Sequence, residues 1–388
     1  MNYRMPSYYK DFKCIADKCP DTCCAGWAIV IDETTMKKYN DLPGKERSYV
    51  KSHIDETEKV YLRHGSRCSF LNENNLCNLY INVGEDKLCK TCTRYPRHFE
   101  EYGNLVEAAL SMSCPVACNM IVNNPLKDKY KIKNNNKISP NAKEVDEHLL
   151  EMLLSVRRNI FKVTNDRKMS IFERMLSVID YGARVQKKVY EYEKLGIKCR
   201  LKLCRERVFS DINKETIKKC FPKKTVCTYY YKTIKSYIDM LLGLENINDN
   251  WPQMIEETKQ LLYENQDKDE YNICFREFGE YMSCREYEYE HILNYFLYTY
   301  FLGGVYDYNI QAMIKLSVLS TLIIRELGMA VWKKQNKKFT VEDQIKVCYQ
   351  FSRQIEHSDE NLMSLEGILT AHPIFDDEKM LSLIYSVV

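Results

Sequence analysis

The amino-terminal part of the chain concentrates thiol side chains, because ten of its 17 cysteines lie before residue 119. Their spacing is Cys14-x4-Cys19-x3-Cys23-Cys24, then Cys68-x8-Cys77-x11-Cys89-x2-Cys92, then Cys114-x3-Cys118. A loop of about two to four residues can bend two sulfurs onto one centre, and clustered cysteines in an intracellular chain are typical of metal binding. We therefore predict a metal site whose ligands come from this set: Cys14, Cys19, Cys23, Cys24, Cys68, Cys77, Cys89 and Cys92.

The residues alone leave the identity of the metal open. A zinc site with mixed ligands needs histidine, and this region offers His53, His64 and His98; zinc bound by cysteine alone and an iron–sulfur cluster both use four thiolates. The CxxxCxxC motif of radical enzymes is not matched, because its third cysteine would stand at Gly26. The spacing matches neither the bacterial ferredoxin run nor a pair of CxxC knuckles.

The adjacent cysteines Cys23 and Cys24 add a geometric constraint. Successive side chains of extended backbone point to opposite faces. We therefore predict that one of the two binds the metal, while the other packs or serves a second centre.

Composition and charge exclude several classes of protein. The net charge of +3 comes from 57 basic and 54 acidic residues, so no strong field for a nucleic acid is expected. The longest uncharged apolar stretches, 292–306 and 316–324, are shorter than the roughly 20 residues of a membrane span. The first residues lack the apolar core of a secretory signal, which predicts a cytoplasmic protein in which disulfides are disfavoured. The sequence does not indicate an oligomeric state.

The predicted fold class is mainly α, with an irregular cysteine-rich metal-binding domain followed by an all-α domain. We expect the cysteine-rich part in residues 1–122, a polar linker or exposed loop in 123–144, and the all-α domain in 145–388, where apolar residues recur at helical spacing. Thr340 and Asp343 have the spacing of a capping box at a helix start. Beyond two helices after Val145, we expect helices near 225–245, 251–266, 272–302, 309–333, 340–356, 359–370 and 376–387.

Six segments together resemble the flagellin lysine-N-methylase family, whose cysteine-rich domain is of the CxxCxxCC type. They are FKCIADKCPDTCCAGWAIVID (12–32), RCSFLNENNLCNLY (67–80), GEDKLCKTCTRYPRHFE (84–100), LSMSCP (110–115), EHILNYFLYTYFLGG (290–304) and FSRQIEHS (351–358). The first two cysteine gaps are wider here than in that short form. The resemblance implies methyl transfer from S-adenosylmethionine to lysine side chains of flagellin. It also implies an iron–sulfur cluster of the 4Fe-4S type, and the cysteines themselves keep zinc as the alternative. Charge and the short apolar stretches, rather than the resemblance, predict neither nucleic acid nor membrane as a partner.

Candidate site residues follow from the chemistry of that reaction. The free lysine side chain has a pKa of about 10.4, so the site must desolvate the amine or supply a base. We predict Tyr95 and Tyr295 as catalytic residues, and Arg94, Arg97 and Asn294 as cofactor-binding residues. Each also has a structural interpretation, as surface arginine, packed tyrosine or satisfied core amide.

Two features keep other functions open. The chain contains no GxG, so it does not use the glycine-loop fingerprint of many nucleotide-binding domains. The same cysteines could staple a non-catalytic protein-binding module, or hold the iron–sulfur cluster of a redox or sensor protein.

Overall fold

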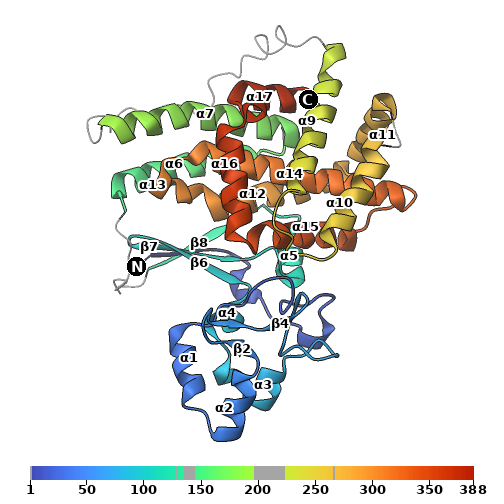
Figure 1. Ribbon diagram of the computed structural model, residues 1–388. Coiled ribbons are helices and arrows are strands. Elements are labelled where there is room, and N and C mark those ends of the chain that lie inside the picture. Colours follow the sequence, from blue (N-terminus) through green and yellow to red (C-terminus); the bar gives the residue numbers. More distant parts are fainter. Residues whose placement is uncertain (1, 128, 135–144, 196–222, 265–266) are drawn as a thin grey trace.

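A computed structural model describes residues 2–127, 129–134, 145–195, 223–264 and 267–388 of the chain. Figure 1 shows helices gathered at one end, the cysteine-rich part at the other, and a four-stranded sheet between them. The prediction of a mainly α fold is confirmed, since helices dominate the described residues after 145.

The sheet has the strand order β6-β7-β1-β8. Its strands are β1 (Asn2–Pro6), β6 (Arg97–Tyr102), β7 (Leu105–Leu110) and β8 (Tyr130–Asn134). Strands β1 and β7 run parallel, and β8 pairs antiparallel with β1, Arg4 opposite Ile132. Strand β8 falls within the predicted linker, so residues 130–134 of that linker belong to the sheet. Residues 123–127 and 129 of the predicted linker form no helix or strand, and residues 128 and 135–144 lie outside the described residues.

The cysteine-rich part contains short elements held by local pairing. These are α1 (Glu33–Asn40), α2 (Gly44–Lys51), β2 (Ile54–Asp55), β3 (Val60–Tyr61), β4 (Arg63–His64), β5 (Arg67–Cys68), α3 (Asn78–Asn82), α4 (Lys90–Arg94) and α5 (Pro115–Val122). Helix α1 begins where the Asp32 side chain accepts a hydrogen bond from the Thr35 amide at 3.2 Å. The elements from α1 to α4 share an apolar core of their own, which includes Tyr39, Val50 and Phe70, whereas α5 packs against α12 (Tyr287–Tyr300) and α15 (Val341–Glu356).

The helical part is built around the long buried helix α14 (Ile310–Lys334). Its neighbours are α6 (Glu147–Thr164), α7 (Ile171–Leu195), α9 (Lys223–Leu241), α10 (Trp251–Lys259), α11 (Lys268–Tyr281), α12 (Tyr287–Tyr300), α13 (Gly304–Asp307), α15 (Val341–Glu356), α16 (Asp359–Ala371) and α17 (Asp377–Tyr385). Helices α7, α12, α15 and α16 pack directly on α14. In the described part of the chain, no helix is both long enough and apolar enough to cross a membrane.

The helix boundaries agree with the sequence in one respect and differ in another. The capping box predicted at the start of α15 is present, with the Thr340 hydroxyl accepting from the Asp343 amide at 3.1 Å. The single helix expected over 272–302 is wrong, because a short 3-10 turn at Ser283–Arg285 separates α11 from α12. Arg285 reaches across this break and donates to the carbonyl of Phe339 at 2.7 Å, a contact that no local pattern reveals.

A buried ionic contact joins the sheet to the helices. Glu107 of β7 and Arg157 of α6 are 4% and 2% exposed, and Nη1 of Arg157 donates to Glu107 Oε2 at 2.8 Å. The same nitrogen donates to the carbonyl of Tyr298 on α12 at 3.0 Å, and Arg4 of β1 pairs with Glu107 at 3.1 Å. This one pair therefore connects two strands with two helices.

A second buried carboxylate lies inside the helical core. Glu326 of α14 is inaccessible to solvent, and its oxygens accept hydrogen bonds from the hydroxyls of Tyr263 at 2.8 Å, Tyr271 at 2.9 Å and Tyr230 at 3.3 Å. Burial raises the pKa of Glu326, and the positive charge of Arg325 together with these hydroxyl donors only partly opposes the shift.

This raised pKa predicts a specific pH dependence of stability. The folded chain binds a proton at Glu326 more tightly than the unfolded chain, so stability from this group is present below the unfolded pKa of 4.5 and declines as pH rises toward the folded pKa. Glu326→Gln carries no such titration. Urea denaturation from about pH 4.5 to pH 8 should show the free energy of unfolding of the wild type falling relative to that of the variant. Parallel curves for the two proteins would contradict the assignment.

Candidate active site

A half-buried carboxylate, Glu356 at the end of α15, is the centre of a polar network between the sheet and the helices. Glu356 accepts hydrogen bonds from the hydroxyls of Tyr295 and Tyr300, each at 3.0 Å, and from the hydroxyl of Ser352. Burial raises the pKa of Glu356, opposed by these three donors and by the more distant His98. Within the described ranges no cation forms an ion pair with Glu356, so the hydrogen bonds that favour its charged form come from hydroxyl groups.

The turn between β7 and α5 connects this carboxylate to a second set of hydroxyls. The amide of Met112 donates to the Tyr295 hydroxyl at 3.0 Å. One residue further, the Ser113 hydroxyl shares hydrogen bonds of 2.9 Å with the Tyr95 hydroxyl, 2.9 Å with Nε2 of His357 and 2.6 Å with the Ser111 hydroxyl. Three residues of the LSMSCP segment thus bring Tyr95 and His357 next to Tyr295 and Glu356.

Arg353 fixes the cysteine-rich part onto α15. Its Nε donates to the carbonyl of Ser113 at 2.9 Å, and its Nη1 pairs with Asp21 at 2.7 Å. The ring of Trp27 lies 4.5 Å from that of His357, and its Nε1 donates to the Cys23 carbonyl at 2.9 Å. Burial, with the charge of Arg353 as a smaller cause, lowers the pKa of His357 to about 3, so this imidazole is neutral at physiological pH.

We call these residues the junction network: Tyr95, Ser111, Ser113, Tyr295, Tyr300, Ser352, Arg353, Glu356 and His357. It lies at the carboxyl end of α15 and is only partly closed from solvent, because Trp27, Tyr95 and His357 are each partly exposed. A raised-pKa carboxylate, a tyrosine hydroxyl bonded to it and aromatic faces at its rim are groups that can accept a proton and steady a cation.

The structure places the five predicted catalytic and cofactor-binding residues in three locations. Tyr95 and Tyr295 come together in the junction network. Arg94 ends α4 and Arg97 begins β6, and their guanidinium carbons lie 5.7 Å from the Phe99 ring centroid and 5.1 Å from that of Phe12, respectively. Asn294 faces the end of α6, and its Nδ2 donates to Asn165 Oδ1 at 3.0 Å.

Sequence reasoning assigned no role to seven of the nine residues of this network, among them Ser111, Ser113, Glu356 and His357. Ser111 and Ser113 stand in LSMSCP, and Glu356 and His357 stand in FSRQIEHS, two segments noted for their family resemblance alone. The only local signal was a group of polar residues at the end of an apolar run. Their function depends on contacts across more than 200 positions, such as His357 with Ser113, which spacing does not reveal.

Five cysteines pack into one apolar core in the cysteine-rich part, and we call them the thiol cluster: Cys24, Cys68, Cys77, Cys89 and Cys92. Short pairings bring their segments together. The Cys68 amide donates to the Cys24 carbonyl at 2.8 Å, and Leu71 forms a bridge with Cys77. The Cys92 amide donates to the Cys89 sulfur at 3.5 Å. Four of the predicted metal ligands therefore share one apolar core, namely Cys68, Cys77, Cys89 and Cys92.

The remaining predicted ligands lie at the edge of that core or beyond it. The Cys23 sulfur is 4.0 Å from the Cys24 sulfur, on the side that faces Trp27. Cys14 is exposed, and Cys19 is half-buried near Asp21 and Arg353. Burial raises the pKa of Cys68 to about 11, whereas a hydrogen bond from the Cys92 thiol lowers that of Cys89 to about 6.

The side chains of the thiol cluster are of the type that binds a metal, but their positions in the structure do not form a metal site. Several sulfurs in an apolar core are the donor set of a thiolate-bound zinc or iron–sulfur site. Among the residues that the structure describes, however, no group of three or more cysteine, histidine, aspartate or glutamate side chains is arranged so that it could hold a metal ion. The cysteines form a pool of candidate ligands rather than a closed site.

Fold and site together define a class: a mainly α protein that carries a cysteine-rich part on a buried network of hydroxyls and a carboxylate. Residues 157–383 match the family model of the FliB lysine N-methylase C-terminal domain. That match includes α12 and α15, and with them Tyr295, Arg353, Glu356 and His357. The chain belongs to the FliB lysine N-methylase family.

Individual relatives match over a shorter stretch. The chain is 34% identical over 131 residues to the lysine-N-methylase of Salmonella choleraesuis (strain SC-B67) and likewise to that of Salmonella typhimurium (strain LT2). Each alignment covers 31% of this chain and 32% of the relative, so the match spans about a third of their length. The flagellar biosynthetic protein FliU of Salmonella muenchen is 33% identical over 131 residues, 31% of this chain and 76% of that protein. No solved structure matches.

Proposed function

We propose that this protein is a protein-lysine N-methyltransferase that transfers the methyl group of S-adenosylmethionine to lysine side chains of flagellin in the cytoplasm. Family membership and the names of the Salmonella relatives support the reaction class and the flagellar substrate. The observation that carries the proposal is the partly buried hydrogen bond between Tyr295 and Glu356, which joins a proton acceptor of raised pKa to the aromatic rim of the junction network.

The proposed reaction assigns a separate task to each part of the network. The lysine ammonium first loses a proton to the Tyr295 hydroxyl as that hydroxyl passes its own proton to Glu356. The neutral amine nitrogen then forms a bond to the methyl carbon while the bond from that carbon to the sulfonium sulfur breaks. Trp27 and Tyr95 present aromatic faces that attract the sulfonium and the ammonium. Arg94 and Arg97, next to Tyr95 in the chain, could anchor the cofactor carboxylate.

Tyr295→Phe tests this proton path. Removing one hydroxyl should lower the turnover number roughly a hundredfold and leave the affinity for S-adenosylmethionine unchanged. Tyr306→Phe is the matched control, since the Tyr306 hydroxyl donates to the backbone carbonyl of Glu101 at 2.6 Å, outside the junction network, and its loss should leave full turnover. Turnover is followed by transfer of a labelled methyl group to flagellin, and cofactor affinity by calorimetric titration. Equal turnover in both variants would exclude Tyr295 from the proton path.

The same titration separates the enzyme from a binding module. A scaffold stapled by metal has no reason to bind S-adenosylmethionine. An absence of binding by the metal-loaded full chain would therefore reject the methyltransferase assignment and favour the non-catalytic alternative.

We further propose that the thiol cluster, extended by Cys23, supplies the ligands of an iron–sulfur cluster of the 4Fe-4S type, with zinc as the alternative. Its contribution when bound is structural: it holds loops together in a region with little regular structure. Transfer of a methyl group from a sulfonium to an amine requires no electron transfer, so the proposed proton path does not involve the metal.

Cys77→Ser is expected to lose most of the bound metal. Cys77 lies in the apolar core between two other segments of the thiol cluster, whereas the exposed Cys284 on the helical side provides the control variant Cys284→Ser. Iron, zinc and acid-labile sulfide are measured on protein purified without oxygen. We expect iron and acid-labile sulfide in the wild type and in Cys284→Ser, and loss of both from Cys77→Ser. Zinc alone would replace the iron–sulfur assignment, and no metal in the wild type would reject both.

A further inference from the structure

A cavity of about 430 Å³ lies at the end of α6, separate from the residues used so far. Its walls come from the last turn of α6, the residues that follow it, and the loop before β8. We call it the basic cavity, and it is lined by Lys127, Arg158, Phe161, Lys162, Asn165 and Asp166. Its volume is in the range of sites for small organic ligands, which is roughly 300 to 1,000 Å³.

The charge of the basic cavity favours an anion. Lys127, Arg158 and Lys162 bring three positive charges from two segments, and none forms an ion pair with a residue that the structure describes. Asp166 is the only acidic side chain in the lining, and it already accepts a hydrogen bond from the backbone amide of Lys168 at 3.2 Å. Three like charges around one cavity repel each other unless an anion lies between them.

Asn165 adds a neutral donor with a fixed orientation. Its Oδ1 accepts from Nδ2 of the fully buried Asn294 at 3.0 Å, and Asn294 Oδ1 in turn accepts from the Thr164 hydroxyl at 2.5 Å. Because Oδ1 of Asn165 is the acceptor in this chain of contacts, Nδ2 of Asn165 is the atom of this amide that can donate to a ligand in the cavity. Asn294, predicted from the sequence to bind a cofactor, thus lies directly behind the basic cavity and supports its wall.

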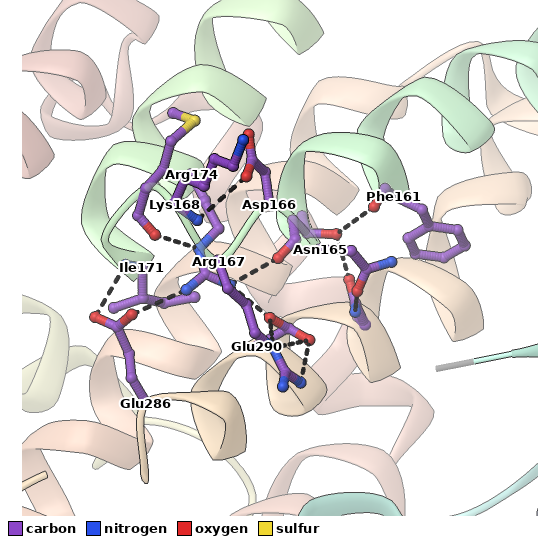
Figure 2. A network of polar contacts seen from close by, with 12 residues as sticks. Phe161, Asn165, Asp166, Arg167, Lys168, Ile171, Arg174, Glu286 and Glu290 are labelled. Atoms are coloured by element: carbon purple, nitrogen blue, oxygen red, sulfur yellow. Dashed lines mark hydrogen bonds and ion pairs between the residues drawn. The ribbon is translucent and has the colours of Figure 1, made fainter. Parts of the chain in front are cut away.

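The walls of the cavity are held by ion pairs to one buried carboxylate, that of Glu290, as Figure 2 shows. Glu290 of α12 is inaccessible to solvent and pairs with Arg167 at 2.8 Å and with Arg174 at 2.7 Å. Arg167 Nη1 also donates to the Pro125 carbonyl at 2.7 Å, which ties the loop bearing Lys127 to the turn after α6. Buried charges are costly to desolvate, so such pairs fix one arrangement of the segments they join.

The apolar part of the cavity lining is the aromatic ring of Phe161. The ring of Phe161 stacks on that of Tyr130 at 5.2 Å and 10°, and Tyr130 stacks on Tyr298 at 4.6 Å. A planar ligand group can extend such a stack with a further offset layer.

We propose that the basic cavity binds a small molecule that carries a phosphate or carboxylate group on an aromatic ring system, of the size of a nucleoside monophosphate. Arg158, Lys162 and Lys127 hold the anionic group, Asn165 donates a hydrogen bond to it, and Phe161 stacks on the ring. S-adenosylmethionine is a poor match for this cavity, because its sulfonium would add a positive charge to the three already present. The inference is therefore independent of the proposed methyl transfer.

Calorimetric titration of the full chain with adenosine monophosphate, adenosine and inorganic phosphate tests the proposal. The monophosphate should bind at least about tenfold more tightly than adenosine or phosphate, because it uses both the cations and the ring. Arg158→Gln and Lys162→Gln should each weaken its binding about five- to tenfold. Phe161→Leu should weaken binding of the monophosphate and leave that of phosphate unchanged.

Lys168→Gln provides the control, because Lys168 is an exposed cation of the same turn that does not line the cavity. The affinity of this variant for adenosine monophosphate should equal that of the wild type. Thermal melting of each variant establishes that the fold is retained. Unchanged affinity in the Arg158→Gln/Lys162→Gln double variant would overturn the proposal, as would no binding of the monophosphate at millimolar concentration. Equal affinity for phosphate and the monophosphate would overturn the aromatic part of the ligand assignment.

Discussion

Replacing Glu356 by glutamine is expected to lower methyl transfer by about a hundredfold or more, since a positioned base contributes at least that factor. The amide keeps the size of the side chain and can still accept from Tyr295 and Tyr300, but it cannot take up a proton. Because burial raises the pKa of Glu356, the wild-type rate should fall as pH drops below that raised pKa, and the variant should lack this decline. The profile of kcat/KM against pH for both proteins measures this difference.

Glu151→Gln serves as the control for this experiment. Glu151 is an exposed residue of α6 outside the junction network, so its variant should keep the wild-type rate and pH profile. A Glu356→Gln protein that is folded, binds S-adenosylmethionine and transfers methyl groups at the wild-type rate would remove Glu356 from the mechanism.

Arg157→Met is expected to destabilise the protein by about 3–5 kcal/mol, the usual cost of leaving a buried charge without its partner. The substitution removes the buried cation beside Glu107, which is 4% exposed, and leaves that carboxylate with only the less buried Arg4 as an ion-pair partner. It also leaves the carbonyl of Tyr298 without the donor that lies 3.0 Å away. The free energy of unfolding from urea titration measures the loss.

Two companion variants make that result interpretable. Lys334→Met breaks an exposed pair with Glu257, whose atoms are 2.7 Å apart, and should cost less than about 1 kcal/mol. Adding Glu107→Leu to Arg157→Met removes the stranded charge and should recover most of the lost stability. A loss below about 1 kcal/mol in Arg157→Met would show that this pair does not hold the sheet against the helices.

Much of the helical part could be predicted from the sequence, because its physics is local. The helix starting at Thr340 combines a capping box with apolar residues at helical spacing, and both signals lie within a few positions. The break between α11 and α12 could not be predicted in the same way. It depends on the contact of Arg285 with Phe339, 54 positions away, and no glycine or proline marks it.

The strands of the sheet were even harder to predict from local sequence than the helix break. Strand β8 has the lysine-rich composition of a loop, and it becomes a strand through pairing with β1 at the other end of the cysteine-rich part. Strand pairing between such distant segments has no counterpart in local composition.

The residues of the candidate site also differ in whether the sequence could predict them. Tyr95 and Tyr295 were predicted from residue type, resemblance and burial, and the structure places both in one network through Met112 and Ser113. Glu356 was not predicted, because a glutamate near the end of an amphipathic helix is usually solvated. Only the packing of three hydroxyls around it distinguishes it from a surface residue.

The central claim is lysine methylation that depends on the junction network, and mass spectrometry of flagellin tests it most directly. Flagellin is coexpressed with the wild-type chain or with Glu356→Gln, and its lysine-containing peptides are compared. We predict peptides heavier by one or more methyl groups with the wild type, and nearly unmodified peptides with the variant. Unmodified flagellin beside soluble, metal-loaded wild-type protein would contradict the account, as would equal modification by both proteins.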